Sequence, residues 1–378
     1  MNKEPVLIIF DGSHLAYSPT TLQLYEELSK KYEVSIIAQY PNNYNGQEAN
    51  IKNIFYHQCY KVKGRYFAWA LFQIILPFNK TARYFKKHGL TYKDYLFRFL
   101  FIKKIIQSKK FKRIICMDNT YLFFCSLLKT KVDFLSLELC MNEHLIPLVD
   151  RSIINCVIIQ SEERYKYLFK NEQLKTFYVQ NAPVFQKINL KEHRKSLIYS
   201  GSTIKILGFY DCLNYLNEYL EEKMTVLGAF FDADKKRVQA EYSNLLQENR
   251  LIVNTKYLNN EDVVKYLSDY EIGFCFYRFD DAFMQKHYFN YMSAPSGKMF
   301  KYLAAGVPVV CSNIIGFQFV KDFECGILIN DLNEKTIRGA IIKIRENFNF
   351  YVKNTQRAAE FYSFDKSISP YLDFIDAE

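Results

Sequence analysis

Short apolar runs alternate with segments of helical periodicity along almost the whole chain. Val6–Phe10 and Arg113–Met117 are apolar at nearly every position, which is typical of strands buried on both faces of a parallel sheet. Segments between such runs, for example Thr20–Lys31 and Glu162–Lys170, place apolar residues three or four positions apart, as amphipathic helices do. Strands that alternate with helices predict an α/β protein with parallel sheets.

The pattern occurs twice, with a polar interruption between the two runs. The first run predicts strands at Val6–Phe10, Val34–Gln39, Arg113–Met117, Val132–Ser136, Cys156–Gln160 and Phe177–Gln180. The second predicts strands at Leu197–Ser200, Met224–Leu227, Leu251–Asn254, Ile272–Phe276, Pro308–Cys311 and Ile327–Ile329. We therefore predict domains at 1–180 and 196–350, a linker at 181–195, and closing helices at Glu334–Glu346 and Asn354–Ile375.

The segment Ala294–Ser312 is the most informative part of the second run. It predicts a loop, a short helix, a glycine at which the helix ends, and a buried strand. Gly306 fits the position after a helix, where a positive φ is needed, and Pro308 prevents the helix from continuing. The free N–H groups at the helix start, with Ser296, Gly297 and Lys298 beside them, suit a phosphate group.

This segment resembles the donor-binding helix of GT-B glycosyltransferases, particularly the retaining family 4, in which a Pro-Ser-rich loop precedes Glu-Ala-x-Ala-x-Gly-x-Pro-Val-Val. The resemblance continues through Ser312, Gly316, Val320 and Gly326–Ile329. It departs from the family at the Glu-x7-Glu pair, where this chain has Ser293 and Lys301.

The resemblance implies two Rossmann-like domains that face a cleft, with the acceptor site in residues 1–180, the nucleotide-sugar site in 196–350 and a last helix, 351–378, that crosses back. It implies a hexosyltransferase-like, metal-independent enzyme with no cofactor, retaining the configuration of the transferred sugar. The substrates would be a nucleotide sugar and a glycan or polyprenyl-linked acceptor. The context would be the synthesis of bacterial surface polysaccharide or glycoconjugate, such as lipopolysaccharide or capsule.

Candidate site residues follow from the rule that ligands bind at the carboxyl ends of strands in doubly wound sheets. We expect the donor at Gly12, Gly201, Ser202, Lys205, Arg278, Ser296, Gly297, Lys298 and Lys301. By resemblance, Ser202 and Lys205 stand at the Arg/Lys pair that grips the pyrophosphate. Lys301 would contact either phosphate or a ribose hydroxyl.

Other interpretations of these residues stay open. A lysine on a short helix is often only solvated, and Gly201 could be simply a turn glycine. Glu138 and Asp118 are the candidates for acids that face the acceptor, with Lys205 as a further catalytic candidate. Either acid could instead be a helix cap or a surface carboxylate.

Charge is distributed unevenly along the chain. Residues 52–113 contain 16 Lys and Arg and one acid, Asp94, so this segment has a net charge of 16 − 1 = +15. The whole chain has a net charge of +10, so the remaining residues together carry +10 − 15 = −5. Aromatic and aliphatic residues are interleaved with the basic ones, around Trp69 and Phe97 for example. This combination suits an anionic membrane surface. Two helices with a solvated basic face are the alternative, and nucleic-acid binding is a third, disfavoured one because no recognisable module is present.

Targeting signals and cysteines indicate where the chain works. No apolar run is long enough for a signal peptide or a membrane-spanning helix. The nine cysteines form no Cys-x-x-Cys pair and mostly lie in apolar runs, which favours buried thiols in a reducing cytoplasm over zinc or disulfides. We therefore expect a cytoplasmic protein, peripheral on the inner face of the membrane. The alternatives to a transferase are a nucleotide-sugar 2-epimerase of the same architecture and a non-catalytic partner in glycan assembly.

Overall fold

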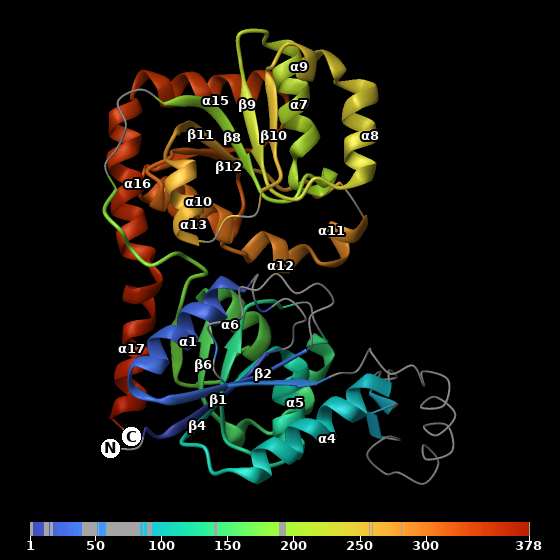
Figure 1. Ribbon diagram of the computed structural model, residues 1–378, viewed down its shortest axis with the longest axis vertical. Helices are drawn as coiled ribbons and strands as arrows, with labels where there is room; N and C mark the ends of the chain where they lie inside the picture. Colours follow the sequence, from blue (N-terminus) through green and yellow to red (C-terminus); the bar gives the residue numbers. More distant parts are fainter. Residues whose placement is uncertain are drawn as a thin grey trace. The chain divides into compact units, whose positions relative to one another are not determined.

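The computed structural model describes residues 3–10, 15, 18–39, 51, 53–57, 84–85, 87–88, 93–139, 142–188, 194–256, 258, 260–280 and 282–377. The chain divides into two compact units (Figure 1). Unit 1 contains Met1–Phe177 and Phe374–Glu378, and unit 2 contains Tyr178–Asp373.

Unit 1 is built on a seven-stranded sheet with the order β3-β2-β1-β4-β5-β6-β7. From β3 to β6, neighbouring strands run parallel; Val6 of β1 lies beside Val34 of β2 and Arg113 of β4. The strands are β1 (Pro5–Ile9), β2 (Glu33–Gln39), β3 (Ile54–His57), β4 (Arg113–Met117), β5 (Val132–Ser136), β6 (Ile154–Ile159) and β7 (Thr176–Tyr178). Its helices include α1 (Pro19–Lys31), α4 (Lys93–Ser108), α5 (Asn119–Leu127) and α6 (Glu162–Phe169).

Unit 2 is built on a six-stranded parallel sheet with the order β10-β9-β8-β11-β12-β13. The strands are β8 (Lys195–Ser200), β9 (Met224–Leu227), β10 (Leu251–Asn254), β11 (Tyr270–Cys275), β12 (Val309–Ser312) and β13 (Gly326–Ile329). The order of the strands reverses between β8 and β11. In doubly wound sheets, the crevice at the carboxyl ends of two such strands is where ligands bind.

Helices cover both faces of the second sheet because residues alternate along each strand (Figure 1). Leu197 and Tyr199 of β8 pack in one apolar cluster with helices α7 (Phe209–Glu218), α8 (Asp232–Glu241), α9 (Ser243–Gln247) and α15 (Glu334–Glu346). Ile198 packs in the other, with α10 (Asn260–Leu267), α13 (Gly297–Ala304), α14 (Gln318–Asp322) and α16 (Phe348–Tyr362). The remaining helices of this unit include α11 (Ala282–Lys286) and α12 (Tyr288–Ser293).

The predicted α/β architecture is confirmed, and most predicted strands lie within two residues of the observed ones. β3 was not predicted, since it is only four residues long and lies in the highly basic part of the sequence. The prediction of one closing helix at Asn354–Ile375 is wrong. The chain instead forms α16 and α17 (Phe364–Asp376), which are separated at Ser363, where ψ is 149° and the backbone leaves the helical conformation.

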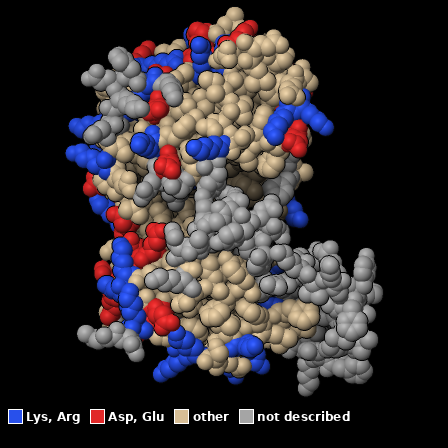
Figure 2. Space-filling view, in the orientation of Figure 1, with Lys and Arg blue, Asp and Glu red and all other residues tan. Residues whose placement is uncertain are grey.

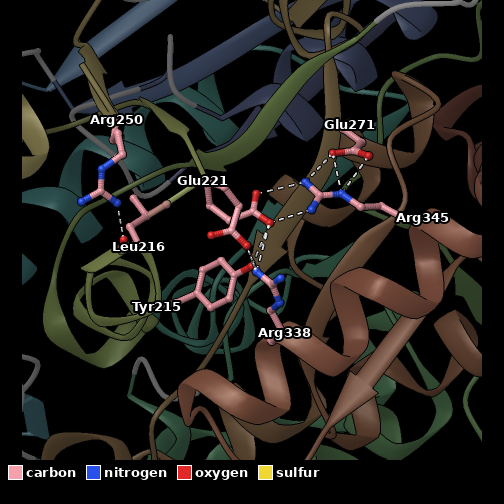
Figure 3. Close-up of polar contacts among 8 residues, drawn as sticks. Tyr215, Leu216, Glu221, Arg250, Glu271, Arg338 and Arg345 are labelled. Atoms are coloured by element: carbon pink, nitrogen blue, oxygen red, sulfur yellow. Dashed lines mark hydrogen bonds and ion pairs between the residues drawn. The ribbon is translucent and has the colours of Figure 1, made fainter. Parts of the chain in front are cut away.

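A polar network joins α15 to the amino-terminal end of the second sheet (Figure 3). Glu222, just before β9, is 2% exposed and accepts hydrogen bonds from Arg345 at 2.6 and 3.0 Å and from the hydroxyl of Tyr215 at 3.2 Å. Arg345 also donates to Glu271 of β11. Burial by itself would lower the pKa of Arg345, but the hydrogen bonds to the two carboxylates raise it. The network lies at the opposite end of the strands from the crevice.

Three further findings concern cysteines, metals and membranes. Seven described cysteines, at positions 116, 125, 156, 212, 275, 311 and 325, are buried and form no disulfide within the described part of the chain. Within the described residues, no three His, Cys, Asp or Glu side chains converge as metal ligands. None of the helices in this part of the chain combines the length and the apolar character needed to cross a bilayer.

Candidate functional site

The carboxyl end of β8 is shaped by two glycines. Gly201 follows β8 with φ +119°, a backbone conformation that residues other than glycine rarely adopt. Gly228 follows β9 with φ +149°, and a Cβ atom there would lie 2.2 Å from the carbonyl oxygen of Gly201. The two backbones therefore meet in direct contact, and the predicted turn at Gly201 lies beside the crevice between β8 and β11.

Lys298, in the first turn of α13, extends toward this crevice. Its Cδ would lie 3.7 Å from a Cβ atom placed on Gly201. Its Nζ lies 5.2 Å from the ring centroid of Tyr199 on β8 and 5.8 Å from that of Tyr277, two residues after β11. The side chain therefore reaches from α13, on one face of the sheet, to Tyr199, which packs on the other face.

The ammonium group of Lys298 is buried and has neither a hydrogen-bond acceptor nor a carboxylate partner in the described part of the chain. Its charge also acts on two neighbouring thiols. Burial raises the pKa of Cys212 and of Cys275, and the positive charge of Lys298 partly opposes both shifts. An unpaired buried cation is costly unless a ligand supplies the missing anion.

The two segments that meet here, the loop after β8 and the start of α13, also carry backbone donors. The N–H of Ser202 makes no hydrogen bond with any described residue, although the N–H groups of Gly201 and Thr203 on either side do. Helix α13 begins at Gly297 without a side-chain cap from Ser296. In its first turn the N–H of Met299 bonds to the carbonyl of Ser296 at 2.9 Å, whereas the N–H groups of Gly297 and Lys298 have no partner among the described residues. The helix dipole makes this end positive. Fixed N–H groups and a buried ammonium form a site suited to an anion such as a diphosphate.

Two predicted cations lie differently. Lys205 is exposed on a short 3₁₀ turn, Lys205–Leu207. Arg278 is engaged by two carboxylates, Asp211 at 2.6 Å and Asp280 at 2.8 Å. It lines a cavity of about 550 Å³ whose other lining residues are Asp211, Tyr277, Phe279, Asp280, Asn330, Asp331, Leu332, Asn333 and Glu334. Four acids against one arginine make this cavity unfavourable for a diphosphate, so Lys298 is the better-placed cation.

Lys301 lies one turn farther along α13 than Lys298. It is half-buried, and its ammonium makes no hydrogen bond or ion pair with the described residues. Burial lowers the pKa of Lys301. Such a lysine resembles Lys298 in lacking a counterion. Its predicted contact with phosphate or ribose remains a prediction.

The predicted site residues of unit 1 have more ordinary surroundings. Asp118 follows β4 and caps α5, because its Oδ1 accepts the N–H of Thr120 at 3.0 Å. Its φ of +77° is unusual for a residue with a side chain and marks local strain at the carboxyl end of a central strand. Glu138 follows β5 and is exposed. Gly12 lies outside the described residues.

Several residues of the crevice were not predicted from the sequence. Tyr199 flanks the ammonium, and Gly228 supports Gly201. Asn181 lies against the start of α13, where a Cβ atom on Gly297 would be 2.8 Å from its Nδ2. Gly228 had a usable signal, since it directly follows a predicted strand. Tyr199 had none, because its role depends on packing between distant segments.

Solved structures share this architecture over the full chain. A sucrose-phosphate synthase from Thermosynechococcus elongatus matches with a TM-score of 0.66 and 13% identity, covering 100% of both chains. An α-glucosyltransferase in complex with UDP-glucose and DNA containing an abasic site matches with a TM-score of 0.56 and 10% identity, covering 99% of both. The chain has the GT-B fold.

The same fold also occurs in an enzyme of another kind. A putative UDP-N-acetylglucosamine 2-epimerase from Listeria monocytogenes matches with a TM-score of 0.59 and 11% identity, covering 98% of this chain and 95% of that one. No protein-family model matches the sequence, and no curated protein matches it. At these identities the likeness concerns the fold, and the function has to be argued from the site.

Proposed function

We propose that this protein is a glycosyltransferase that moves a sugar from a nucleotide-sugar donor to a glycan or lipid-linked acceptor. The observation that carries the proposal is the buried, unpaired ammonium of Lys298 at the reversal of strand order in unit 2. The GT-B fold supports it, since one enzyme with this fold was solved with UDP-glucose. The ammonium of Lys298 and the N–H of Ser202 have no partner among the described residues, and the diphosphate of a nucleotide sugar would supply one.

The chemistry follows from the charge of this site. When the bond between the anomeric carbon and the diphosphate oxygen breaks, negative charge grows on the leaving group. A fixed ammonium and oriented N–H groups stabilise that charge more in the transition state than in the donor. The acceptor hydroxyl then forms the new bond to the anomeric carbon, and its proton goes to the departing phosphate oxygen. This course needs no protein base and retains the configuration of the sugar.

Unit 1 would carry the acceptor. Asp118 and Glu138 lie at the carboxyl ends of two adjacent strands, and Asp118 has the strained backbone that often marks a functional position. We propose the synthesis of bacterial surface polysaccharide or glycoconjugate as the context, as the family resemblance implies. A lipid-linked acceptor would require the enzyme to approach a membrane.

Helix α4 supports peripheral attachment to an anionic membrane. Phe97 and Leu100 are 48% and 47% exposed, and Lys103 and Lys104 nearby are exposed as well. Three other cations of the basic segment pair with acids instead: Lys109 with Glu33, Lys112 with Glu4 and Arg113 with Asp133. On the face shown in Figure 2, the described basic side chains are interspersed with acidic ones. Residues 58–83, which include Trp69, lie outside the described part.

A thermal-shift panel of UDP, GDP, CMP and ADP tests the proposal. We expect one of these nucleotides to raise the melting temperature by several degrees, because a ligand that binds only the folded state stabilises it. The stabilising nucleotide also names the donor base. The proposal fails if none of them shifts the melting temperature at millimolar concentration.

A nucleotide-sugar 2-epimerase is the second candidate, favoured by the structural likeness to the Listeria monocytogenes protein. Incubation with the identified donor separates the two. A transferase releases nucleoside diphosphate in proportion to the acceptor added. An epimerase instead changes the sugar configuration with no acceptor present.

A further inference from the structure

Tyr302 on α13 is inserted at the carboxyl end of β8. Its side chain is fully buried, and its hydroxyl oxygen accepts the N–H of Ser200 at 2.6 Å. The same hydroxyl lies 3.4 Å from the carbonyl oxygen of Ile198, to which it donates. The ladder between β8 and β11 ends with Tyr199 beside Phe274, one residue earlier. On the β11 side, the phenol of Tyr302 therefore replaces a strand as the partner of Ser200, while β9 pairs with Ser200 on the other side.

Gly273 of β11 makes room for this phenol. A Cβ atom on Gly273 would lie 2.8 Å from two carbons of the Tyr302 ring, closer than such atoms can approach. Burial raises the pKa of Tyr302, so the phenol keeps its proton at any physiological pH and can both donate and accept. The ring and the glycine thus form a fixed contact between α13 and the sheet.

This contact lies directly before the proposed diphosphate site. Ser200 is held by Tyr302, and the N–H of Gly201 is held by the carbonyl of Leu227 at 2.8 Å. The carbonyl of Ser202 accepts the hydroxyl of Tyr199 at 2.8 Å. The N–H groups on either side of Ser202 and its own carbonyl are therefore held by hydrogen bonds, while the N–H of Ser202 has no partner among the described residues.

We propose that Tyr302 is a positioning residue for the donor diphosphate. Its hydroxyl fixes Ser200, so that the N–H of Ser202 stays directed at the position beside Lys298 that an oxygen of the diphosphate would occupy. The same helix carries Lys298, four residues before Tyr302, so one rigid element sets both the ammonium and the backbone donor. The inference rests on the proposed function, because it assigns Tyr302 a role at that site.

The test compares Tyr302→Phe with Tyr215→Phe. Each removes one buried hydroxyl from unit 2, but the hydroxyl of Tyr215 bonds to Glu222 at the amino end of the sheet. We expect both variants to lower the melting temperature. Only Tyr302→Phe should also weaken binding of the stabilising nucleoside diphosphate, by roughly tenfold, the size expected for a donor held in the wrong direction. Equal affinities for Tyr302→Phe and the wild type would overturn the proposal.

Hydrogen exchange separates failure of this inference from failure of the proposed function. Without ligand, Tyr302→Phe should speed amide exchange in residues 198–203, and Tyr215→Phe should not. Unchanged exchange in that segment would overturn the positioning role whether or not a nucleotide binds. A wild-type protein that binds no nucleotide would overturn both the proposed function and the donor role of Tyr302.

Discussion

The guanidinium of Arg278 is held by the carboxylate of Asp211, with 2.6 Å between Nη1 and Oδ1. Asp211 is only 6% exposed, and its other oxygen, Oδ2, is buried without a hydrogen-bond partner in the described part of the chain. Burial raises the pKa of Asp211, and the charge and hydrogen bond of Arg278 oppose that rise. Arg278 therefore acts as the counterion of a buried acid. Lys298, which has no such acid beside it, is the cation that we assign to the diphosphate.

Replacing Arg278 by methionine should destabilise the protein by about 2–3 kcal/mol near neutral pH, because it leaves a buried carboxylate unpaired. Without the arginine the pKa of Asp211 rises further above 3.8, so the folded state binds the proton more tightly than the unfolded state. Stability then falls as pH rises through the folded pKa. Urea unfolding should therefore show a larger loss at pH 8 than at pH 4.5.

The double variant Arg278→Met with Asp211→Asn is the control for this experiment. It removes the unpaired charge and should recover most of the lost stability. A loss for Arg278→Met that is the same at both pH values would contradict the assigned role.

The buried Glu222 predicts a second, purely structural effect. Arg345→Met should cost about 3 kcal/mol of unfolding free energy, because Glu222 is 2% exposed and Arg345 is its main partner. Arg237→Met is the matched control, since Arg237 pairs with Glu241 on the surface and such pairs contribute less than about 1 kcal/mol. Nucleotide affinity should be unchanged in both variants, and a loss in Arg345→Met would show that the two ends of the sheet are coupled.

Replacement of Lys301 by methionine should raise the stability of the protein and weaken nucleotide binding. Burial lowers its pKa, so its charged form is disfavoured in the folded protein, and Lys301→Met should raise stability at pH 7. This gain should shrink as pH rises toward 10.5, because the wild-type lysine then also loses its proton. If Lys301 contacts phosphate or ribose, the same variant binds the nucleotide less tightly. Unchanged affinity and turnover would exclude Lys301 from the donor site.

The predictions from sequence succeeded where a local pattern decides the structure. Buried strands such as Met224–Leu227 and the helix that ends at Gly306 were recognisable, because apolar runs and glycine positions act within a few residues. The place of Lys298 at a helix start was likewise recognisable, and its contact with a donor stays a prediction. The roles of Tyr199 and Tyr302 were not recognisable, because both depend on contacts between β8 and α13. These elements are far apart in the sequence, and Ser200 and Tyr302 are 102 residues apart.

Arg278 shows a second limit of prediction from sequence, which concerns the partners of a charged side chain. The sequence places it after β11, where a ligand is expected, but it does not reveal that Asp211 lies beside it from α7. Whether a cation is free for a ligand depends on such tertiary partners. The sequence therefore indicated the edge of the sheet where the cations lie. Only the packing shows which of these cations have acidic partners.

The exposed face of α4 predicts binding to anionic vesicles. The wild-type protein should co-sediment with phosphatidylglycerol vesicles at low salt and much less at high salt, because screening weakens the attraction. Phe97→Ser with Leu100→Ser should reduce binding several-fold, since these side chains would enter the interface. Phe350→Ser is the control, an exposed phenylalanine of α16 in unit 2. No sedimentation of the wild type at low salt would remove the membrane claim.

Calorimetric titration of Lys298→Met with the stabilising nucleoside diphosphate tests the central claim most directly. Methionine keeps the length and most of the packing of the lysine but removes the ammonium, and Lys321→Met changes an exposed lysine of α14 in the same unit. We predict that Lys298→Met stays folded and loses at least about tenfold in affinity, as expected for a charge-assisted contact worth about 1.5–3 kcal/mol, while Lys321→Met binds like the wild type. Equal affinities for all three proteins would contradict the account.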